Sequence, residues 1–382
     1  MHTNDTPSPT KNAIQALAYQ RLTMNYPQAA MILYQAAGSI ETVYEHRKDI
    51  REIMPEATEL LAKTLNVDWG STLQWAENEL RWCKEKNIQF LHPGMAEYPQ
   101  RLTNCFDAPV GLFYLGNTNL NAEHIISIVG TRQSTPYGHD MLHRIIADLK
   151  RMVPDVLIVS GLAYGIDVCS HKEALAAGLD TVGVLAHGLD TMYPASHRNI
   201  AAQMVRQGGL LTEYPSQTRG DRANFLRRNR IVAGMSDCTI VAESMEHGGS
   251  LVTARIANDY GREVFAIPGR ITDKASEGCN DLIRNNKGVM LTSAQDIIDL
   301  LGWTTVQAKE AARGQGIQPS LFPTLSPDQQ RIVEALRNND LQLNALAMTT
   351  GIPIGKMSAV LFEMEMQGMV KALAGGTYHL TL

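Results

Sequence analysis

The chain has 382 residues, enough for two or three domains of ordinary size. Hydrophobic residues make up 44% of it and charged residues 19%, which indicates a folded globular protein and excludes a disordered one. The net charge of −5 excludes a general electrostatic attraction to nucleic acid. Any nucleic-acid binding must therefore come from arginines and lysines that gather locally.

The cysteines and the longest apolar runs indicate in which cellular compartment the protein is found. The five cysteines are an odd number and form no CxxC pair, which favours buried thiols in a reducing compartment over zinc ligands or disulfides. The first segment, MHTNDTPSPTK, is polar, and the longest apolar runs are too short to cross a bilayer. We therefore expect a cytosolic protein with no membrane association and no metal site.

Residues 1–85 have a helical pattern. Segments such as AAMILYQA and TELLAKTL place apolar residues three and four positions apart, and strand-like alternation is scarce. This pattern predicts a small helical domain, and none of its residues resembles a catalytic set.

Residues 86–303 alternate short runs rich in Val and Ile with helical segments. The runs are ISIVG, VLIVSG, TVGVLA, GLLTEYP, CTIVAES and EVFAIPG. This alternation predicts an α/β domain with a doubly wound, mostly parallel sheet covered by helices. Ligands of such sheets bind at the carboxyl ends of the strands, and the glycine-rich or polar turns of this segment fall at those ends.

The last part of the chain changes composition again. Residues 304–325 are rich in Gly, Pro, Gln and Ser without periodicity, which is typical of a linker. Residues 326–382 contain three helical segments, with Gly351 in a turn, followed by a hairpin pattern. This order predicts a winged helix.

Three turns at strand ends have the composition of anion sites. IVGTR offers Arg132, SGLAYGID offers Ser160 and Gly161, and HGGSLVTARIA offers Gly-Gly-Ser at the start of a helix. Each turn taken alone is equally well explained as a tight turn. Neither GxGxxG nor GxxxxGK[ST] occurs, so we expect no NAD site, no ATP hydrolysis of the P-loop type and no other cofactor.

The segment RANFLRRNRIVAG, residues 222–234, gathers four arginines around Phe225 in an otherwise acidic chain. Arginine binds phosphate through two parallel hydrogen bonds, and an aromatic ring can stack on an unpaired base. In a helix, Arg227 and Arg230 lie on one face. The alternatives are a solvated basic face, or arginines paired with Glu and Asp across the sheet. Lys172 is a weaker candidate for a ligand contact, because its position on a predicted helix is equally compatible with a solvent-exposed lysine.

These motifs, together with LLTEYP, GREVFAIPG and GCNDLIR, resemble the DNA-processing protein A family, also called DprA or Smf, from about Tyr98 to Leu291. The resemblance implies an extended Rossmann-like domain, a SAM or helix-hairpin-helix-like domain before it and a winged helix after it. It also implies a cytosolic, non-enzymatic protein that binds single-stranded DNA, protects incoming strands during natural transformation and loads the RecA recombinase. Members typically form homodimers through the Rossmann-like domain.

The resemblance also assigns a DNA site, carried over motif by motif, and no catalytic residue. Its members here are Arg132, Ser160, Gly161, Lys172, Arg222, Phe225, Arg227, Arg228, Arg230, Gly248, Gly249 and Ser250. Two positions depart from the pattern of many members, which have a basic residue in place of Tyr164 and proline in place of Leu226. Because phosphate contacts carry no sequence information, we expect binding that tolerates any sequence and weakens with salt.

Two other functions are compatible with parts of the sequence. A Rossmann-like nucleotide phosphoribohydrolase would share the Gly-Gly turn but needs a Glu in the next helical turn, where this chain has Ala254 to Ala257. A transcription factor could use the winged helix, but its candidate recognition helix carries Lys356 beside Glu363 and Glu365.

Overall fold

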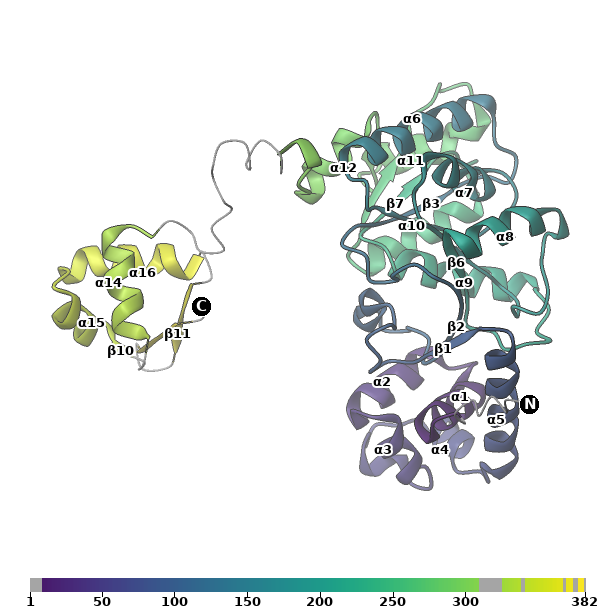
Figure 1. Ribbon diagram of the computed structural model, residues 1–382, viewed down its shortest axis with the longest axis horizontal. Helices are drawn as coiled ribbons and strands as arrows, with labels where there is room; N and C mark the ends of the chain where they lie inside the picture. The colour runs from purple at the N-terminus through teal and green to yellow at the C-terminus, as the bar shows by residue number, and fades with distance from the viewer. Residues whose placement is uncertain (1–8, 309–324, 338–340, 367–368, 374–376, 381–382) are drawn as a thin grey trace, which may run out of the picture. The chain divides into compact units, whose positions relative to one another are not determined.

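The computed structural model describes residues 9–308, 325–337, 341–366, 369–373 and 377–380. The chain divides into two compact units, Met1–Val306 and Gln307–Leu382 (Figure 1). Of the predicted linker, residues 309–324 lie outside the described residues.

The first part of the larger unit is helical, as the spacing of its apolar residues predicts. Side chains of Thr10, Ser39 and Thr58 cap three of its helices by accepting hydrogen bonds from backbone N–H groups of the first turn. Its elements are α1 (Lys11–Thr23), α2 (Pro27–Ala37), α3 (Ile40–Glu45), η1 (Ile50–Glu52), α4 (Glu59–Leu65) and α5 (Gly70–Glu85).

A sheet follows, and its strands lie in the order β1-β2-β6-β5-β4-β3-β7-β8-β9 among the described residues. From β3 the chain builds β4, β5 and β6 on one side and then crosses to β7, β8 and β9 on the other, all parallel. The strands are β1 (Gln89–Leu91), β2 (Leu112–Gly116), β3 (Ile125–Val129), β4 (Leu157–Ser160), β5 (Thr181–Val184), β6 (Gly208–Thr212), β7 (Cys238–Val241), β8 (Glu263–Ala266) and β9 (Val289–Met290). The predicted doubly wound sheet is confirmed. Strands β1 and β2 add an antiparallel edge, which was not predicted from the sequence.

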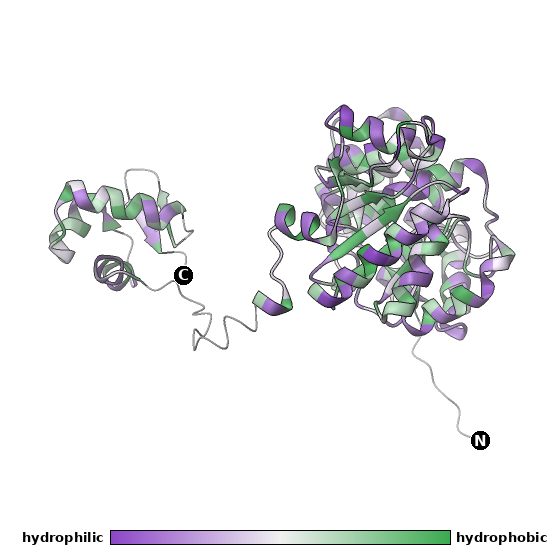
Figure 2. Ribbon diagram, turned by 90° about the horizontal axis from the view of Figure 1, so that it is seen from above, coloured by the Kyte–Doolittle hydropathy of each residue, from purple (hydrophilic) through white to green (hydrophobic). Residues whose placement is uncertain are grey.

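Helices cover both faces of the sheet, and apolar strands lie between them (Figure 2). On β3, Ile126 and Ile128 contribute to a core with α6, α7 and α12, whereas Ile125 and Val129 contribute to a core with α9 and α10. This alternation explains the continuous apolar runs of the parallel strands. The helices are α6 (Pro136–Met152), α7 (Ile166–Ala177), α8 (Arg198–Arg206), α9 (Arg222–Gly234), α10 (Gly249–Asp259), α11 (Glu277–Arg284) and α12 (Ala294–Leu301).

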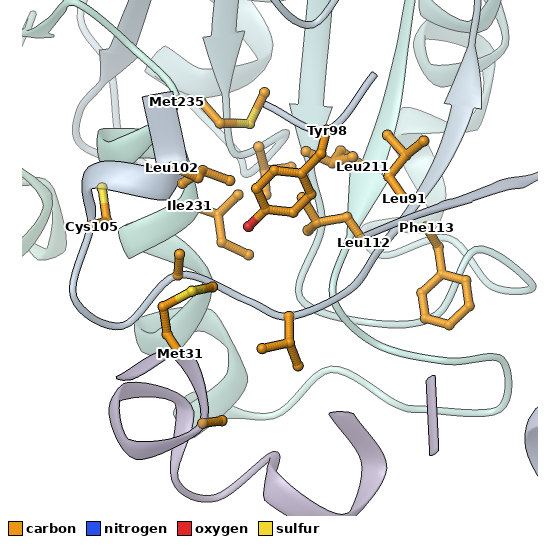
Figure 3. Close-up of a cluster of buried hydrophobic side chains, with 14 of the residues drawn as sticks. Met31, Leu91, Tyr98, Leu102, Cys105, Leu112, Phe113, Leu211, Ile231 and Met235 are labelled. Carbon is orange, nitrogen blue, oxygen red and sulfur yellow. The ribbon is translucent and has the colours of Figure 1, made fainter. Parts of the chain in front are cut away.

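The helical part and the α/β part share one core. Figure 3 shows the ring of Tyr98 among side chains that include Leu102, Leu112 and Ile231, with Met31 of α2 nearby. The predicted boundary at residue 85 coincides with the end of α5, but apolar packing continues across it.

Two sets of hydrogen bonds join the same two parts. The Gln20 amide donates to the carbonyl oxygen of Glu213 at 2.6 Å. The N–H and the hydroxyl of Ser216 donate to the Glu79 carboxylate at 2.6 and 2.7 Å. These contacts fix the segment between β6 and α9 to helices α1 and α5.

The smaller unit has the predicted winged-helix order and its own apolar core. Gly351, with a φ of 69°, ends α15 in the left-handed conformation that glycine adopts without strain. Its elements are α14 (Pro327–Leu336), β10 (Leu341–Gln342), α15 (Leu343–Thr350), α16 (Ile354–Met366), β11 (Val370–Leu373) and β12 (Thr377–Leu380). The strands pair in the order β10-β12-β11.

Among the described helices, none by itself has the length and apolar character needed to cross a membrane. The pair α15 and α16 reaches that length and composition only when the two are combined, and it is bent by 108°. The five cysteines are all buried as free thiols.

His171 on α7 is a buried titratable group in the α/β core. Its Nδ1–H donates to the Thr181 hydroxyl at 2.7 Å, because that hydroxyl already donates to the carbonyl oxygen of Ile158. Nε2 has no hydrogen-bonding partner among the described residues. Burial, with a smaller contribution from Arg228, lowers the pKa of His171 to about 3.

This depressed pKa predicts a loss of stability in acid. Below its ordinary pKa the histidine binds a proton in the unfolded chain and stays neutral in the folded one, so stability falls as the pH falls from about 6.5 toward 3. At about pH 5 the difference amounts to roughly 2 kcal/mol. His171→Asn, which keeps the donor but cannot titrate, should remove this part of the pH dependence of urea unfolding. The control His247→Asn changes an exposed side chain and should keep it; equal pH dependence in all three proteins would contradict the assignment.

Candidate nucleic-acid interface

Helix α9 begins at the strand-end edge of the sheet, after the segment that follows β6. The Asp221 side chain caps it by accepting a hydrogen bond from the N–H of Asn224 at 2.8 Å. Helical spacing divides the arginine cluster, because Phe225 and Arg228 lie on one face and Arg227 and Arg230 on another. The two faces have different surroundings.

The guanidinium of Arg228 is buried at the ends of β4 and β5. Its Nη1 donates to the carbonyl oxygens of Gly161, at 2.5 Å, and of Val184. A Cβ atom on residue 161 would overlap this guanidinium, which explains why glycine stands there. Arg228 therefore fixes α9 against two strand ends.

Asp167, in the first turn of α7, provides the opposite charge. Burial raises the pKa of Asp167, while Arg228 and, more weakly, Arg132 act to lower it. Burial lowers the pKa of Arg228, and Asp167 opposes that shift. Asp167 and Arg228 therefore influence each other's pKa, although they form no direct ion pair among the described residues. Asp167 is not among the site residues predicted from the sequence. The one feature that could have indicated it is its position in the first turn of a helix, where an acidic side chain is favoured.

Arg132, in the turn after β3, is exposed and forms no ion pair in the part of the chain that the structure describes. Its guanidinium carbon lies 5.6 Å from the ring centre of Phe225. The ring of Tyr193 meets the same phenyl ring edge-on, with centres 5.8 Å apart. Tyr193 is not among the site residues predicted from the sequence. We call Arg132, Asp167, Tyr193, Phe225 and Arg228 the Phe225 site.

The other face of α9 is not part of this site. Arg230 is buried and forms an ion pair with Glu213 at 2.6 Å, and Asp107 lies 3.9 Å away. The alternative explanation of the arginine cluster, that arginines pair with Glu and Asp, therefore applies to Arg230. Arg227 is exposed, and its Nη1 donates to the Asn25 side chain at 3.5 Å. Arg222 is exposed as the first residue of α9.

Two further predicted residues, Ser160 and Lys172, differ in exposure. The buried Ser160 hydroxyl donates to the carbonyl oxygen of Ile128 at 2.5 Å, so only the backbone of Ser160 is left to meet a ligand. Lys172 is exposed in the second turn of α7, and its five-residue separation from Asp167 places it on a different side of that helix.

Gly248, Gly249 and Ser250 follow β7, the strand next to β3, at the start of α10. The Ser250 hydroxyl is buried and donates to the Ser244 hydroxyl at 2.9 Å. Among the described residues no side chain caps α10, so backbone N–H groups of its first turn are left for solvent or an anion. The role of these residues as the floor of an anion site stays a prediction.

A carboxylate occupies the strand ends between β3 and β7. The buried side chain of Glu243 accepts hydrogen bonds from the hydroxyl and the N–H of Thr135, the latter at 2.9 Å. A Cβ on Gly138 would overlap this carboxylate. Dinucleotides bind doubly wound sheets where the strand order reverses, and here the Glu243 side chain and its hydrogen bonds to Thr135 occupy that position.

The doubly wound sheet, the winged-helix unit and the strand ends with arginine and aromatic side chains define a Rossmann-like protein with a cationic, aromatic surface site. Residues 89–302 match the DNA recombination-mediator protein A family, and residues 318–376 match the DprA winged helix domain. The chain belongs to the DNA recombination-mediator protein A family, as the resemblance of its motifs indicated.

Relatives and solved structures agree with this membership. Protein Smf of Escherichia coli is 33% identical over 308 residues, which cover 78% of this chain and 79% of that protein. Protein Smf of Synechocystis is 32% identical over 325 residues, covering 77% and 81%. The structure of DNA processing protein A from Streptococcus pneumoniae matches with a TM-score of 0.62 and 29% identity, covering 77% of this chain and 98% of that one.

A second solved structure concerns the single-stranded DNA binding mode of DNA processing protein A from Helicobacter pylori. It matches with a TM-score of 0.51 and 27% identity, covering 56% of this chain and 95% of that one.

Arg227 and Arg230 lie on the same face of α9, but Arg230 is buried and Arg227 is exposed, so neutral substitutions of the two should differ in their effect on stability. Arg230→Met should lower the free energy of unfolding by about 3–5 kcal/mol, because it leaves the Glu213 carboxylate buried without its partner. Arg227→Met, three residues earlier on the exposed surface, should change it by less than about 0.5 kcal/mol. Urea unfolding of both variants measures the difference. Equal stabilities would show that Arg230 is not held by this ion pair.

Proposed function

We propose that this protein binds single-stranded DNA at the Phe225 site, without base specificity and without cutting the strand. The observation that carries the proposal is the exposed guanidinium of Arg132, which lies 5.6 Å from the Phe225 ring centre and has no ion-pair partner in the described part of the chain. An unneutralised cation beside an aromatic ring suits a phosphate and an adjacent unpaired base. Family membership and the single-stranded DNA binding of the Helicobacter relative support the same function.

Each group of the site has a distinct task in this proposal. Arg132 and Arg222 contact phosphates, and bases lie against Phe225 and the edge of Tyr193. Arg228 acts as a positioning residue, since its guanidinium is buried and donates to the carbonyl oxygens of Gly161 and Val184. Phosphate contacts without base-edge contacts give binding that any sequence satisfies.

Protection of incoming strands, loading of RecA, homodimer formation through the Rossmann-like part and a cytosolic location are predictions that follow from family membership. Each of them requires a strand or partner surface that the Phe225 site alone does not define.

A nucleotide hydrolase of the phosphoribohydrolase type is not favoured. The helical turn that would carry its glutamate holds Ala254 and Ala257, both buried, and the nearby Ser250 hydroxyl is engaged by Ser244. Incubation with nucleoside monophosphates should release no free base, and release would support the hydrolase.

The winged helix offers little positive charge to DNA. Lys356 is the one Lys or Arg among the described residues of α16, and it pairs with Asp328 of α14. Removing residues 324–382 should therefore change affinity for single-stranded DNA less than about threefold, since surface contacts outside the site contribute little. Fluorescence anisotropy with a labelled oligothymidylate measures this. A large loss of affinity would make the winged helix the DNA-binding element.

Substitutions in the Phe225 site test the proposal directly. Arg132→Gln should lower affinity for single-stranded DNA about tenfold and reduce the slope of log affinity against log salt by about 0.7, the contribution of one phosphate contact. Phe225→Leu should lower affinity by a similar factor, through lost stacking, with an unchanged salt slope. The control Arg144→Gln removes an exposed charge from α6. If all three variants bind like the wild type, DNA does not bind at this site.

A further inference from the structure

A hollow lies beside the segment that leads into α9. It has a volume of about 290 Å³ and is lined by α1, α5 and residues 215–218. We call it the Trp75 groove, after the side chain that α5 contributes to its wall. Two residues further along the same segment, Gly220 lies against Phe225, since a Cβ there would be 3.4 Å from the ring. One short segment therefore borders both the groove and the Phe225 site.

The groove has the same two chemical components as the Phe225 site. The guanidinium carbon of Arg21 lies 3.9 Å from the ring centre of the half-buried Trp75. Arg21 is exposed and forms no ion pair within the described residues. Arg227 contacts Asn25, the neighbour of the groove residue Met24, so a second cation without a carboxylate partner lies close by.

The acidic residue one turn after Trp75 already has hydrogen-bonding partners inside the protein. Both carboxylate oxygens of Glu79 accept hydrogen bonds from Ser216, at 2.6 and 2.7 Å. The positive charge of Arg21 and Arg227 is thus complementary to a phosphate, and the indole offers a surface for a base.

We propose that the Trp75 groove is a second nucleobase subsite, which receives further nucleotides of the single strand bound at the Phe225 site. The proposal rests on the proposed function. The groove is close to the lower limit of about 300 Å³ for small-ligand pockets, a size that suits an unpaired base and excludes a duplex. The helical part of the chain then takes part in DNA binding and lengthens the bound segment.

The test uses the full-length protein and oligothymidylates of about 5 and about 20 nucleotides, the shorter within one site and the longer spanning both. Trp75→Leu and Arg21→Gln should each lower affinity for the longer strand about tenfold and leave affinity for the shorter strand unchanged. Trp75→Phe, which restores an aromatic ring, should bind the longer strand nearly as well as the wild type. The matched control Arg81→Gln removes an exposed charge of α5 that is paired with Glu77.

Photocrosslinking identifies the contact independently of affinity. A strand of about 20 nucleotides carrying 5-iodouracil should crosslink to the peptide that contains Trp75, and Phe225→Leu should weaken binding of both strand lengths. Unchanged affinity for the longer strand in Trp75→Leu and Arg21→Gln, with no crosslink to this peptide, would overturn the subsite. If Phe225→Leu alone then lost affinity, the proposed function would stand. A groove that serves a peptide partner would give that same pattern. Because Arg21 is exposed, its variant keeps the test valid even if Trp75→Leu proves unstable.

Discussion

A buried guanidinium must find acceptors inside the protein, and the way Arg228 finds them determines the rest of the site. It donates to the carbonyl oxygens of Gly161, directly after β4, and of Val184, which ends β5, and Asp167 opposes the effect of burial on its pKa. These contacts hold α9 across the strand ends and place Phe225, one turn earlier on the same face, beside Arg132. The exposed cation can act on a ligand because the buried one is already satisfied.

Ion pairs between buried or partly buried arginines and acidic residues explain how a chain with net negative charge can still have a cationic site. Arg230 pairs with Glu213, and Arg101 pairs with Asp237 at 2.6 Å, so these arginines serve the core and the packing of elements. Within the part of the chain that the structure describes, Arg132 and Arg222 are exposed near the strand ends and have no ion-pair partner. Total charge is therefore a poor guide to binding in this molecule, because pairing decides which arginines act outward.

Much of the fold was predictable from the sequence, and the reason is local. The apolar runs of β3 to β8 alternate with helical segments, and both patterns repeat within a few residues. The edge strands β1 and β2 are not bounded by such a pattern, and their antiparallel pairing depends on distant partners. The motifs correctly identified the family.

The site was predictable in composition but not in arrangement. Helical phase alone places Arg227 and Arg230 together, yet it does not reveal that Arg230 turns toward Glu213, which lies on the preceding segment, and Asp107, which is far away in the sequence. Asp167 and Tyr193 belong to the site because they lie near Arg228 and Phe225 of α9. The spacing of residues along the sequence does not predict that proximity.

The hydrogen bonds between Glu79 and Ser216 affect how a single DNA strand would lie along the surface. They fasten the segment bordering Phe225 to the helix that carries Trp75, so the spacing between the two aromatic side chains is set by the fold rather than by a hinge. A flexible strand laid across both would be stretched to that fixed interval. The helical part would then act as a ruler, setting the distance between successive bases that the protein holds apart.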